Sequence, residues 1–115
     1  MADCIFCRIA SGEIPATIVG RNEHAVAFRD LNPQAPTHVL VIPIGHLGST
    51  IDADSDPAEV TVGRTIRLAV QVAKELGLAE NGYRLVLNTG RDGGQSVGHL
   101  HVHLLGGRRM GWPPG

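Results

Sequence analysis

The chain has 115 residues, a length that favours a single domain with a core large enough to fold without disulfide bonds. Hydrophobic residues make up 43% of the sequence and charged residues 18%, with a formal net charge of −1, which is typical of a globular protein rather than a disordered one. The low aromatic content of 3% and the lack of a basic run argue against a nucleic-acid surface, and no apolar stretch approaches the roughly 20 residues of a membrane span. No basic segment followed by an apolar core marks a secretory signal, so we expect a cytoplasmic protein.

The first half of the chain predicts a small antiparallel sheet preceded by a short helix or turn. This first element covers residues 1–10, and the Ser-Gly-Glu-Ile-Pro sequence that follows interrupts it. Residues 17–21 and 24–29 are runs of strand-forming residues separated by Asn22 and Glu23, a pattern that predicts a hairpin. After a proline-rich loop, residues 37–42 are nearly all apolar, which is typical of a central strand covered on both faces.

The second half predicts one long helix and two further strands. Asp56 as the cap, Pro57 in the first turn and Glu59 mark the start of the helix, and Gly77 marks its end. Between them, apolar residues recur at three- and four-residue steps, at positions 62, 66, 69, 70, 73 and 76. Residues 83–88 predict a strand, 89–94 a glycine-rich loop, 98–105 a second strand and 106–115 an irregular tail. Antiparallel strands around one long helix give an α+β fold.

Three of the six histidines alternate with apolar residues between His99 and His103. Because alternate residues of a strand share a face, we expect a row of three imidazoles with neighbours about 6.5–7 Å apart, and apolar side chains packed under the helix. Such a row has three interpretations. It is a polar strand surface, a catalytic zinc site of three histidines, or a site for catalysis on a phosphate ester or amide in which one histidine is the nucleophile.

The loop before this strand favours phosphate chemistry. Its glycines allow backbone N–H groups to approach a phosphate closely, and Asn88, Gln95 and Ser96 add neutral hydrogen-bond donors. A hydrolytic zinc site also needs a carboxylate base near the metal, and none lies beside the three histidines in the sequence. The sequence therefore favours a histidine nucleophile that attacks phosphorus.

A second motif, Cys4-Ile5-Phe6-Cys7, also has three interpretations. The two thiols are unpaired and buried, or form a redox pair, or supply half of a structural zinc site. A redox pair is disfavoured because the motif does not follow a strand in a βαβ unit. A zinc site needs two more ligands, for which His24, His46 and His99 are candidates.

The sequence from His99 to Leu105 resembles the His-φ-His-φ-His-φ-φ signature of the histidine triad (HIT) superfamily, in which φ is an apolar residue. Further segments are similar to the Hint branch of that superfamily, namely residues 3–8, 28–30, 33–38, 93–96 and 112–115. The resemblance implies a single HIT domain over residues 1–115. This domain would have an antiparallel sheet of about five strands, one long helix and a short N-terminal helix, with the sheet continued across a homodimer.

The resemblance also implies a hydrolase that cleaves the P–N bond of purine nucleoside 5′-phosphoramidates, releasing AMP or GMP and an amine. His101 would be the nucleophile and would form a nucleotidyl-histidine that water then hydrolyses, with no catalytic cofactor. His103 and His38 would contact the phosphate and assist proton transfer, and Ser96 would lie beside the leaving group. The other residues that would bind the nucleotide are Ile5, Phe6, Ile9, Phe28, Asp30, Leu31, Asn88, Gly94 and Gln95.

Two further features follow from the same resemblance. Cys4, Cys7, His46 and His99 would hold a structural zinc ion, which leaves the other two histidines of the triad free for phosphate. The tail, residues 106–115, would reach the active site of the partner subunit and influence substrate choice. Gly98 departs from the bulky residue that many relatives carry before the first histidine, and it would open the pocket near the leaving group.

Three alternatives to a phosphoramidase remain open at this point. The first is a dinucleoside polyphosphate hydrolase or nucleotidyl transferase on the same scaffold. The second is a nucleotide-binding interaction module without catalysis. The third is a metalloenzyme that uses the three histidines as zinc ligands.

Overall fold

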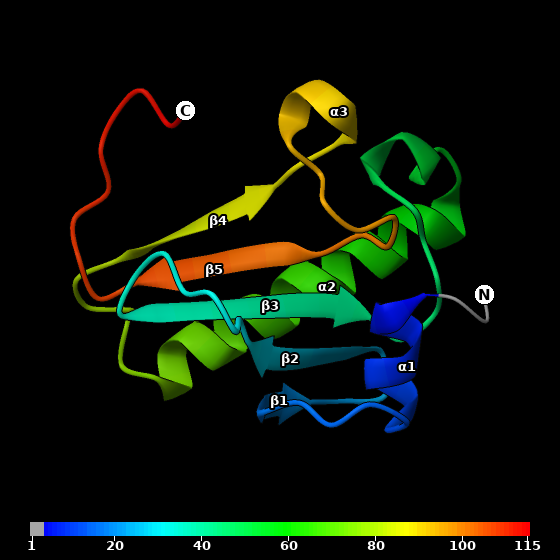
Figure 1. The fold of residues 1–115 in the computed structure, drawn as a ribbon, viewed down its shortest axis with the longest axis horizontal. Helices are drawn as coiled ribbons and strands as arrows, with labels where there is room; N and C mark the ends of the chain where they lie inside the picture. The colour runs from blue at the N-terminus through cyan, green and yellow to red at the C-terminus, as the bar shows by residue number, and fades with distance from the viewer. Residues whose placement is uncertain (1–3) are drawn as a thin grey trace.

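A computed structural model describes residues 4–115, so residues 1–3 of the predicted first element lie outside the described residues. The elements in chain order are α1 (Ile5–Ser11), β1 (Ile18–Arg21), β2 (Ala25–Arg29), β3 (Thr37–Pro43), the 3-10 helix η1 (Thr50–Asp52), α2 (Asp56–Glu75), β4 (Tyr83–Leu87), α3 (Gly90–Gly93) and β5 (Val102–Gly106). Within this range the strands form one five-stranded antiparallel sheet with the order β1-β2-β3-β5-β4 (Figure 1). The predicted α+β class is confirmed.

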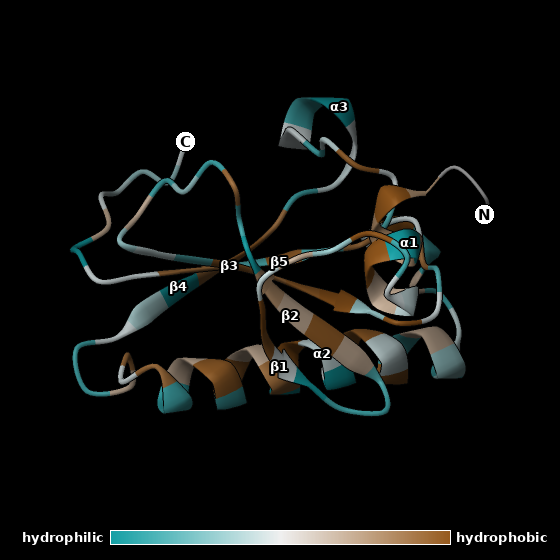
Figure 2. Cartoon of the chain, turned by 60° about the horizontal axis from the view of Figure 1, so that its bottom comes forward, coloured by the Kyte–Doolittle hydropathy of each residue, from teal (hydrophilic) through white to brown (hydrophobic). Residues whose placement is uncertain are grey.

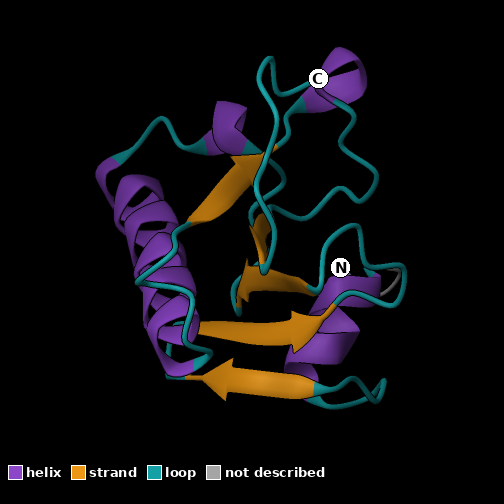
Figure 3. Cartoon of the chain, turned by 90° about the vertical axis from the view of Figure 1, so that its left-hand side faces the viewer, coloured by secondary structure: helices purple, strands orange, loops and turns teal. Residues whose placement is uncertain are grey.

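The two faces of the sheet carry different helices, with α2 on one face and α1 on the other (Figure 3). From the central strand β3, Val39 and Val41 pack in the apolar cluster under α2, while Leu40 and Ile42 pack in the cluster that includes α1. Every residue of β3 after Thr37 is buried, which confirms the prediction of a strand covered on both faces. Burial of each such aliphatic side chain contributes about 1.5–3 kcal/mol, so β3 is the stable centre of the sheet.

Helix α2 lies along the sheet as predicted, but its cap differs from the prediction (Figure 2). Ser55 rather than Asp56 is the N-cap, because the Ser55 hydroxyl accepts a hydrogen bond from the backbone N–H three residues later. The buried face is also wider than the predicted stripe and includes Leu68 and Val72. Gly77 follows the helix with φ of 76°, which confirms the predicted end. Neither α2 nor any other helix within residues 4–115 has the length and hydropathy needed to cross a membrane.

The two turns predicted from sequence have different outcomes. The hairpin at Asn22 and Glu23 is confirmed, and the Asn22 side-chain oxygen accepts the backbone N–H groups of His24 and Ala25 at 2.8 and 2.9 Å. The glycine-rich segment 89–94 was predicted as a loop but contains the single helical turn α3. That turn ends at Gly94, whose φ of 81° is in the left-handed region.

The strand predicted over residues 98–105 begins later, at Val102. Residues 97–99 form a bend instead, and the backbone N–H of Leu100 donates to the carbonyl of Leu47 at 2.6 Å rather than to a neighbouring strand. Because Leu47 lies in the loop after β3, this bend depends on a contact distant in sequence. His99 and His101 therefore precede β5, and His103 lies within it.

Candidate functional site

The register of β3 and β5 brings His38 and His103 together. Leu40 lies opposite His103, and His38 lies opposite Leu105, so the two histidines are diagonal neighbours on one face of the sheet. Side chains of this length can bridge a diagonal separation. His38 Nε2 lies 2.9 Å from His103 Nδ1. Since Leu40 packs in the cluster with α1, the histidine pair lies on the α1 side of the sheet.

Hydrogen bonds determine which nitrogen of each imidazole carries the proton. The backbone N–H of Gln34 donates to His38 Nδ1 at 3.0 Å, so neutral His38 carries its proton on Nε2. Nε2–H then donates to His103 Nδ1, and neutral His103 carries its own proton on Nε2. This arrangement leaves His103 Nε2–H as a donor for a bound group. Side-chain patterns missed Gln34, because a backbone N–H has no residue-type signal.

His101 has the complementary arrangement. Its Nδ1 lies 2.8 Å from the backbone carbonyl oxygen of His99 and must donate, because a carbonyl can only accept. Nε2 of His101 therefore keeps its lone pair. The ring is buried, with 4% of its surface exposed, and it meets Phe6 of α1 edge-on at 5.2 Å between centroids. The His103 ring lies beside it at 5.1 Å, so a nucleophilic nitrogen and a donor residue share one site.

The pKa values of His38 and His103 keep both side chains neutral at pH 7. Burial, as the largest cause, and the neighbouring His101 and His38 together lower the pKa of His103 to about 4, against the opposing effect of Asp30. Burial also lowers the pKa of His38, against the opposing effect of Asp30, whose Oδ2 lies 3.5 Å from His38 Nε2. This agrees with the hydrogen bonds, in which Nδ1 of His38 and Nδ1 of His103 both act as acceptors and must be unprotonated.

Asp30, His38 and His103 also offer ligand atoms within 4.8 Å of one another, which raises the question of a metal. A metal-bound imidazole nitrogen must be deprotonated, with the proton on the other nitrogen. In His38 the other nitrogen accepts from the Gln34 N–H, so the proton is on Nε2, the atom that would face the metal. The hydrogen bonds therefore favour acid–base chemistry by the side chains of Asp30, His38 and His103 over the binding of a metal ion.

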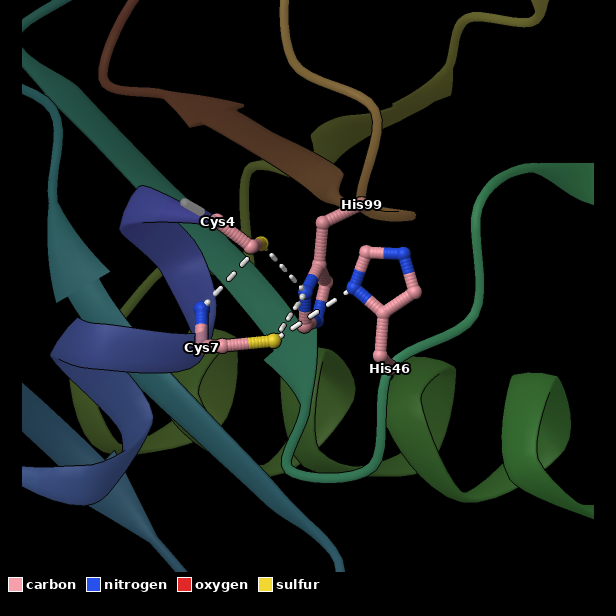
Figure 4. Close-up of side chains that lie close together, drawn as sticks. All are labelled: Cys4, Cys7, His46 and His99. Atoms are coloured by element: carbon pink, nitrogen blue, oxygen red, sulfur yellow. Dashed lines mark hydrogen bonds between the residues drawn. The ribbon is translucent and has the colours of Figure 1, made fainter. Parts of the chain in front are cut away.

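His99 and His101 precede β5, so the prediction that the three histidines lie on one strand is wrong, and His99 contacts a different set of side chains. It joins Cys4, Cys7 and His46 from the other end of the chain and from the loop after β3 (Figure 4). His99 Nδ1 lies 3.3 Å from Cys4 Sγ and 3.5 Å from Cys7 Sγ, and His46 Nδ1 lies 3.4 Å from Cys7 Sγ. The bend before β5 turns His99 into this cluster. A single metal held by all three triad histidines therefore has no support in the geometry.

The four residues of this cluster fit a zinc ion. Around tetrahedral zinc with bonds of about 2.0–2.3 Å, neighbouring ligand atoms lie roughly 3.3–3.8 Å apart, which matches the measured separations. His99 Nε2 lies 2.9 Å from the carbonyl of Pro43, so Nε2–H donates there and Nδ1 is free for a metal. Burial and Cys4 raise the pKa of Cys7, so a bound cation would displace a thiol proton. His24, the other candidate ligand, lies 2.8 Å from Arg64 instead.

Of the residues predicted to line the base pocket, three are buried and two are exposed. Phe6, Ile9 and Phe28 are buried in the apolar cluster with α1, where Phe6 and Phe28 meet edge-on at 5.6 Å between centroids. Ile5 and Leu31 are exposed, with 47% and 99% of their surfaces accessible. The structure therefore places three of the predicted base-pocket residues in the core and two on the surface.

The predicted phosphate loop is held to the loop that carries His46. Both amide hydrogens of Gln95 are used, since Nε2 donates to the carbonyls of Gly48 at 2.7 Å and Val97 at 2.9 Å. Its Oε1 accepts the backbone N–H of Gly90 at 3.0 Å. The Gln95 side chain thus stabilises the conformation of the loop, and its polar atoms are already hydrogen-bonded within the protein. Of the other predicted loop contacts, Gly94 and Ser96 are exposed and Asn88 is half-buried.

Comparisons with known proteins agree with this geometry. Residues 11–110 match the model of the HIT domain family. The chain is 52% identical over 112 residues to a 14 kDa zinc-binding protein from Zea mays, covering 96% of this chain and 87% of that protein. It is 49% identical over 109 residues to a purine nucleoside phosphoramidase from Escherichia coli strain K12, covering 95% and 91% of the two chains. The crystal structure of a HIT family hydrolase from Legionella pneumophila Philadelphia 1 has a TM-score of 0.93 at 50% identity, covering 98% of this chain and all of that one. The protein therefore belongs to the HIT domain family.

Proposed function

We propose that this protein hydrolyses purine nucleoside 5′-phosphoramidates, with His101 as the nucleophile. The observation that carries the proposal is the hydrogen bond from His101 Nδ1 to the His99 carbonyl, which leaves a lone pair on Nε2 of a neutral ring. The similarity to the Escherichia coli phosphoramidase supports the choice of substrate class. In this proposal Asp30, whose Oδ2 lies 3.5 Å from His38 Nε2, accepts hydrogen bonds from ribose hydroxyls.

The first chemical step breaks the P–N bond. His101 Nε2 attacks phosphorus, the P–N bond breaks as a nucleotidyl-histidine forms, and the departing nitrogen takes up a proton from solvent while His103 Nε2–H donates a hydrogen bond to it. The 2.9 Å hydrogen bond from His38 Nε2–H to His103 Nδ1 keeps that donor hydrogen on His103 Nε2. Asp30 stabilises positive charge on the pair when protons are in excess. Ser96 lies in the exposed loop as a further donor to the leaving group.

The second step releases the nucleotide. Water attacks phosphorus, the bond to His101 Nε2 breaks, and the attacking water gives up a proton to solvent as the nucleoside monophosphate forms. The products are a nucleoside monophosphate and an enzyme restored to its first protonation state. The predicted nucleotide contacts of the base-pocket residues and of the phosphate loop belong to this proposal.

The proposal includes a structural zinc ion on Cys4, Cys7, His46 and His99. When bound, zinc supplies a rigid tetrahedral crosslink and leaves the acid–base steps to the side chains. Support comes from the fitting separations of the four residues and from the zinc-binding relative in Zea mays. Since Cys4 caps α1, the crosslink would fix Phe6 against His101.

We also propose a homodimer, a tail that reaches the partner's site, and a cytoplasmic location. The location is supported by the thiols of Cys4 and Cys7, which are both free and contact histidines, an arrangement that a reducing compartment preserves.

The test is to trap the covalent intermediate. Enzyme is mixed with adenosine 5′-phosphoramidate, quenched in alkali to protect the P–N bond to histidine, digested and analysed by mass spectrometry. We expect a nucleotidyl group on His101, and we expect His101→Ala to lose at least about a thousandfold in kcat while AMP binding persists. His24→Ala is the matched control, because His24 contacts Arg64 outside the site.

Two outcomes would overturn the phosphoramidase proposal. Faster turnover of diadenosine polyphosphates than of the phosphoramidate would indicate a dinucleotide hydrolase. AMP binding without any adduct or turnover would indicate a binding module.

A further inference from the structure

The start of the C-terminal tail is hydrogen-bonded to the loop that determines the His38 tautomer. Arg108 Nη2 donates to the backbone carbonyl of Gln34 at 2.9 Å, and Nη1 donates to the carbonyl of Arg109 at 3.1 Å. The backbone N–H of the same Gln34 donates to His38 Nδ1 at 3.0 Å. The exposed Arg108 thus holds the backbone of Gln34, whose N–H determines which nitrogen of His38 carries the proton.

Close packing supports the same connection. Gly107 has φ of 89°, and a Cβ at this position would lie 2.8 Å from the Pro36 side chain, so the tail and the loop are in direct contact. At its other end the loop is held by Asp30, whose Oδ1 accepts the backbone N–H of Asn32 at 2.7 Å. The Gln34 side chain donates to the Asn32 carbonyl at 3.0 Å. Arg108 fixes the middle of the loop, between these local turns and Pro36.

Loss of the Gln34 contact would change the chemistry of the pair. Without a donor at Nδ1, neutral His38 can carry its proton on either nitrogen. With the proton on Nδ1, His38 Nε2 becomes an acceptor, and His103 must then place its proton on Nδ1 to keep their hydrogen bond. His103 Nε2 would lose its hydrogen and would no longer act as a donor to phosphate or leaving group.

We propose that Arg108 is a positioning residue for the histidine pair, acting through the Gln34 backbone to keep the protons of His38 and His103 on Nε2. Its effect on rate rests on the proposed function, whereas its effect on the tautomers does not. Arg109 is the neighbouring exposed arginine and makes no side-chain hydrogen bond among residues 4–115, so it offers a matched control.

The experiment compares Arg108→Met, which keeps the aliphatic stem but removes all donors, with Arg109→Met. Nitrogen NMR of the imidazoles in the whole protein reports which nitrogen is protonated. In the wild type and in Arg109→Met, we expect His38 Nδ1 to be unprotonated and Nε2 to be protonated. In Arg108→Met, we expect mixed tautomers at His38 and His103 and faster hydrogen exchange at the Gln34 amide.

Kinetics with adenosine 5′-phosphoramidate give the second readout. We expect Arg108→Met to lower kcat by about ten- to a hundredfold with KM nearly unchanged. Arg108→Lys, which can still donate to the Gln34 carbonyl, should recover most of that loss. Wild-type tautomers and kcat in Arg108→Met would overturn the inference. Wild-type protein with the expected tautomers but no turnover would instead overturn the proposed function and leave the tautomer inference intact.

Discussion

At the scale of single residues, His103 makes the site sensitive to acid. Its pKa in the folded protein is about 4, below the ordinary 6.5, mainly because the ring is buried. Between these two values the unfolded chain binds more protons than the folded chain, so the free energy of unfolding falls as pH drops from 6.5 towards 4. We expect His103→Gln to reduce the slope of the unfolding free energy against pH, by an amount equivalent to the uptake of up to one proton on unfolding. The free energy is measured by urea unfolding at a series of pH values.

His24→Gln is the control for that measurement. His24 contacts Arg64 and its side chain is 37% exposed, away from the buried histidine pair, so its removal should leave the pH slope unchanged. Equal slopes for wild type and His103→Gln would contradict the assignment of the acid sensitivity to His103. His38 and His99, whose pKa values are also lowered by burial, would contribute to the part of the slope that remains in His103→Gln.

Part of the grouping of the candidate site residues was predictable from the sequence, but their protonation was not. The alternation of His101 and His103 correctly predicts that their rings are neighbours. The tautomers depend on two backbone groups, the carbonyl of His99 and the N–H of Gln34, and every residue carries such groups. Only the folded chain shows which of them face an imidazole.

At the scale of elements, local patterns predicted those parts that local forces determine. Three such features depend only on residues close in sequence, and the structure contains all of them: the apolar run of β3, the turn at Asn22 and the periodicity of α2. The start of β5 was not predictable in this way. Its strand pattern continues back to Gly98, but the bond from Leu100 to the Leu47 carbonyl, 53 positions away, draws the chain out of the sheet.

Helix α1 is the element that depends most on the cysteine–histidine cluster. It has seven residues, too few to be stable alone, and Cys4 both caps it and belongs to the cluster. We expect removal of zinc with a strong chelator to lower the Tm by several degrees and to speed hydrogen exchange in residues 5–11, while α2 stays protected. Metal content, thermal unfolding and exchange mass spectrometry are measured on the same sample.

Cys7→Ser is the matched variant for zinc removal, since it keeps the size of the side chain and removes a soft ligand. It should reproduce the exchange pattern of the chelated protein without added chelator. If α1 exchanges at the original rate after the metal has been removed, the crosslink proposed for this cluster is wrong.

At the scale of the whole molecule, we propose that a second copy pairs with the β4 edge of the sheet. Strand β4 is at one end of the strand order, beside β5, and within the described residues no strand covers its outer side. Its sequence, Tyr-Arg-Leu-Val-Leu, lacks the proline and the density of charge that usually protect edge strands. Arg84 Nη2 donates to the Gly111 carbonyl at 2.9 Å, so the tail is held beside this same edge.

Antiparallel pairing of β4 with β4 of a second copy would satisfy this edge by twofold symmetry and bring each tail to the partner. We expect the wild type to have about twice the mass of the 12.2 kDa chain in light scattering after size exclusion. Val86→Lys should yield the single-chain mass, because Val86 lies outside the apolar cluster that holds Tyr83, Leu85 and Leu87, and lysine opposes edge pairing. Ile18→Lys, on the opposite edge strand β1 with 44% of Ile18 exposed, is the control and should remain dimeric. A wild type of single-chain mass, or a Val86→Lys variant that stays dimeric, would show that β4 is not the interface, and the tail would then have no route to a partner's site along this edge.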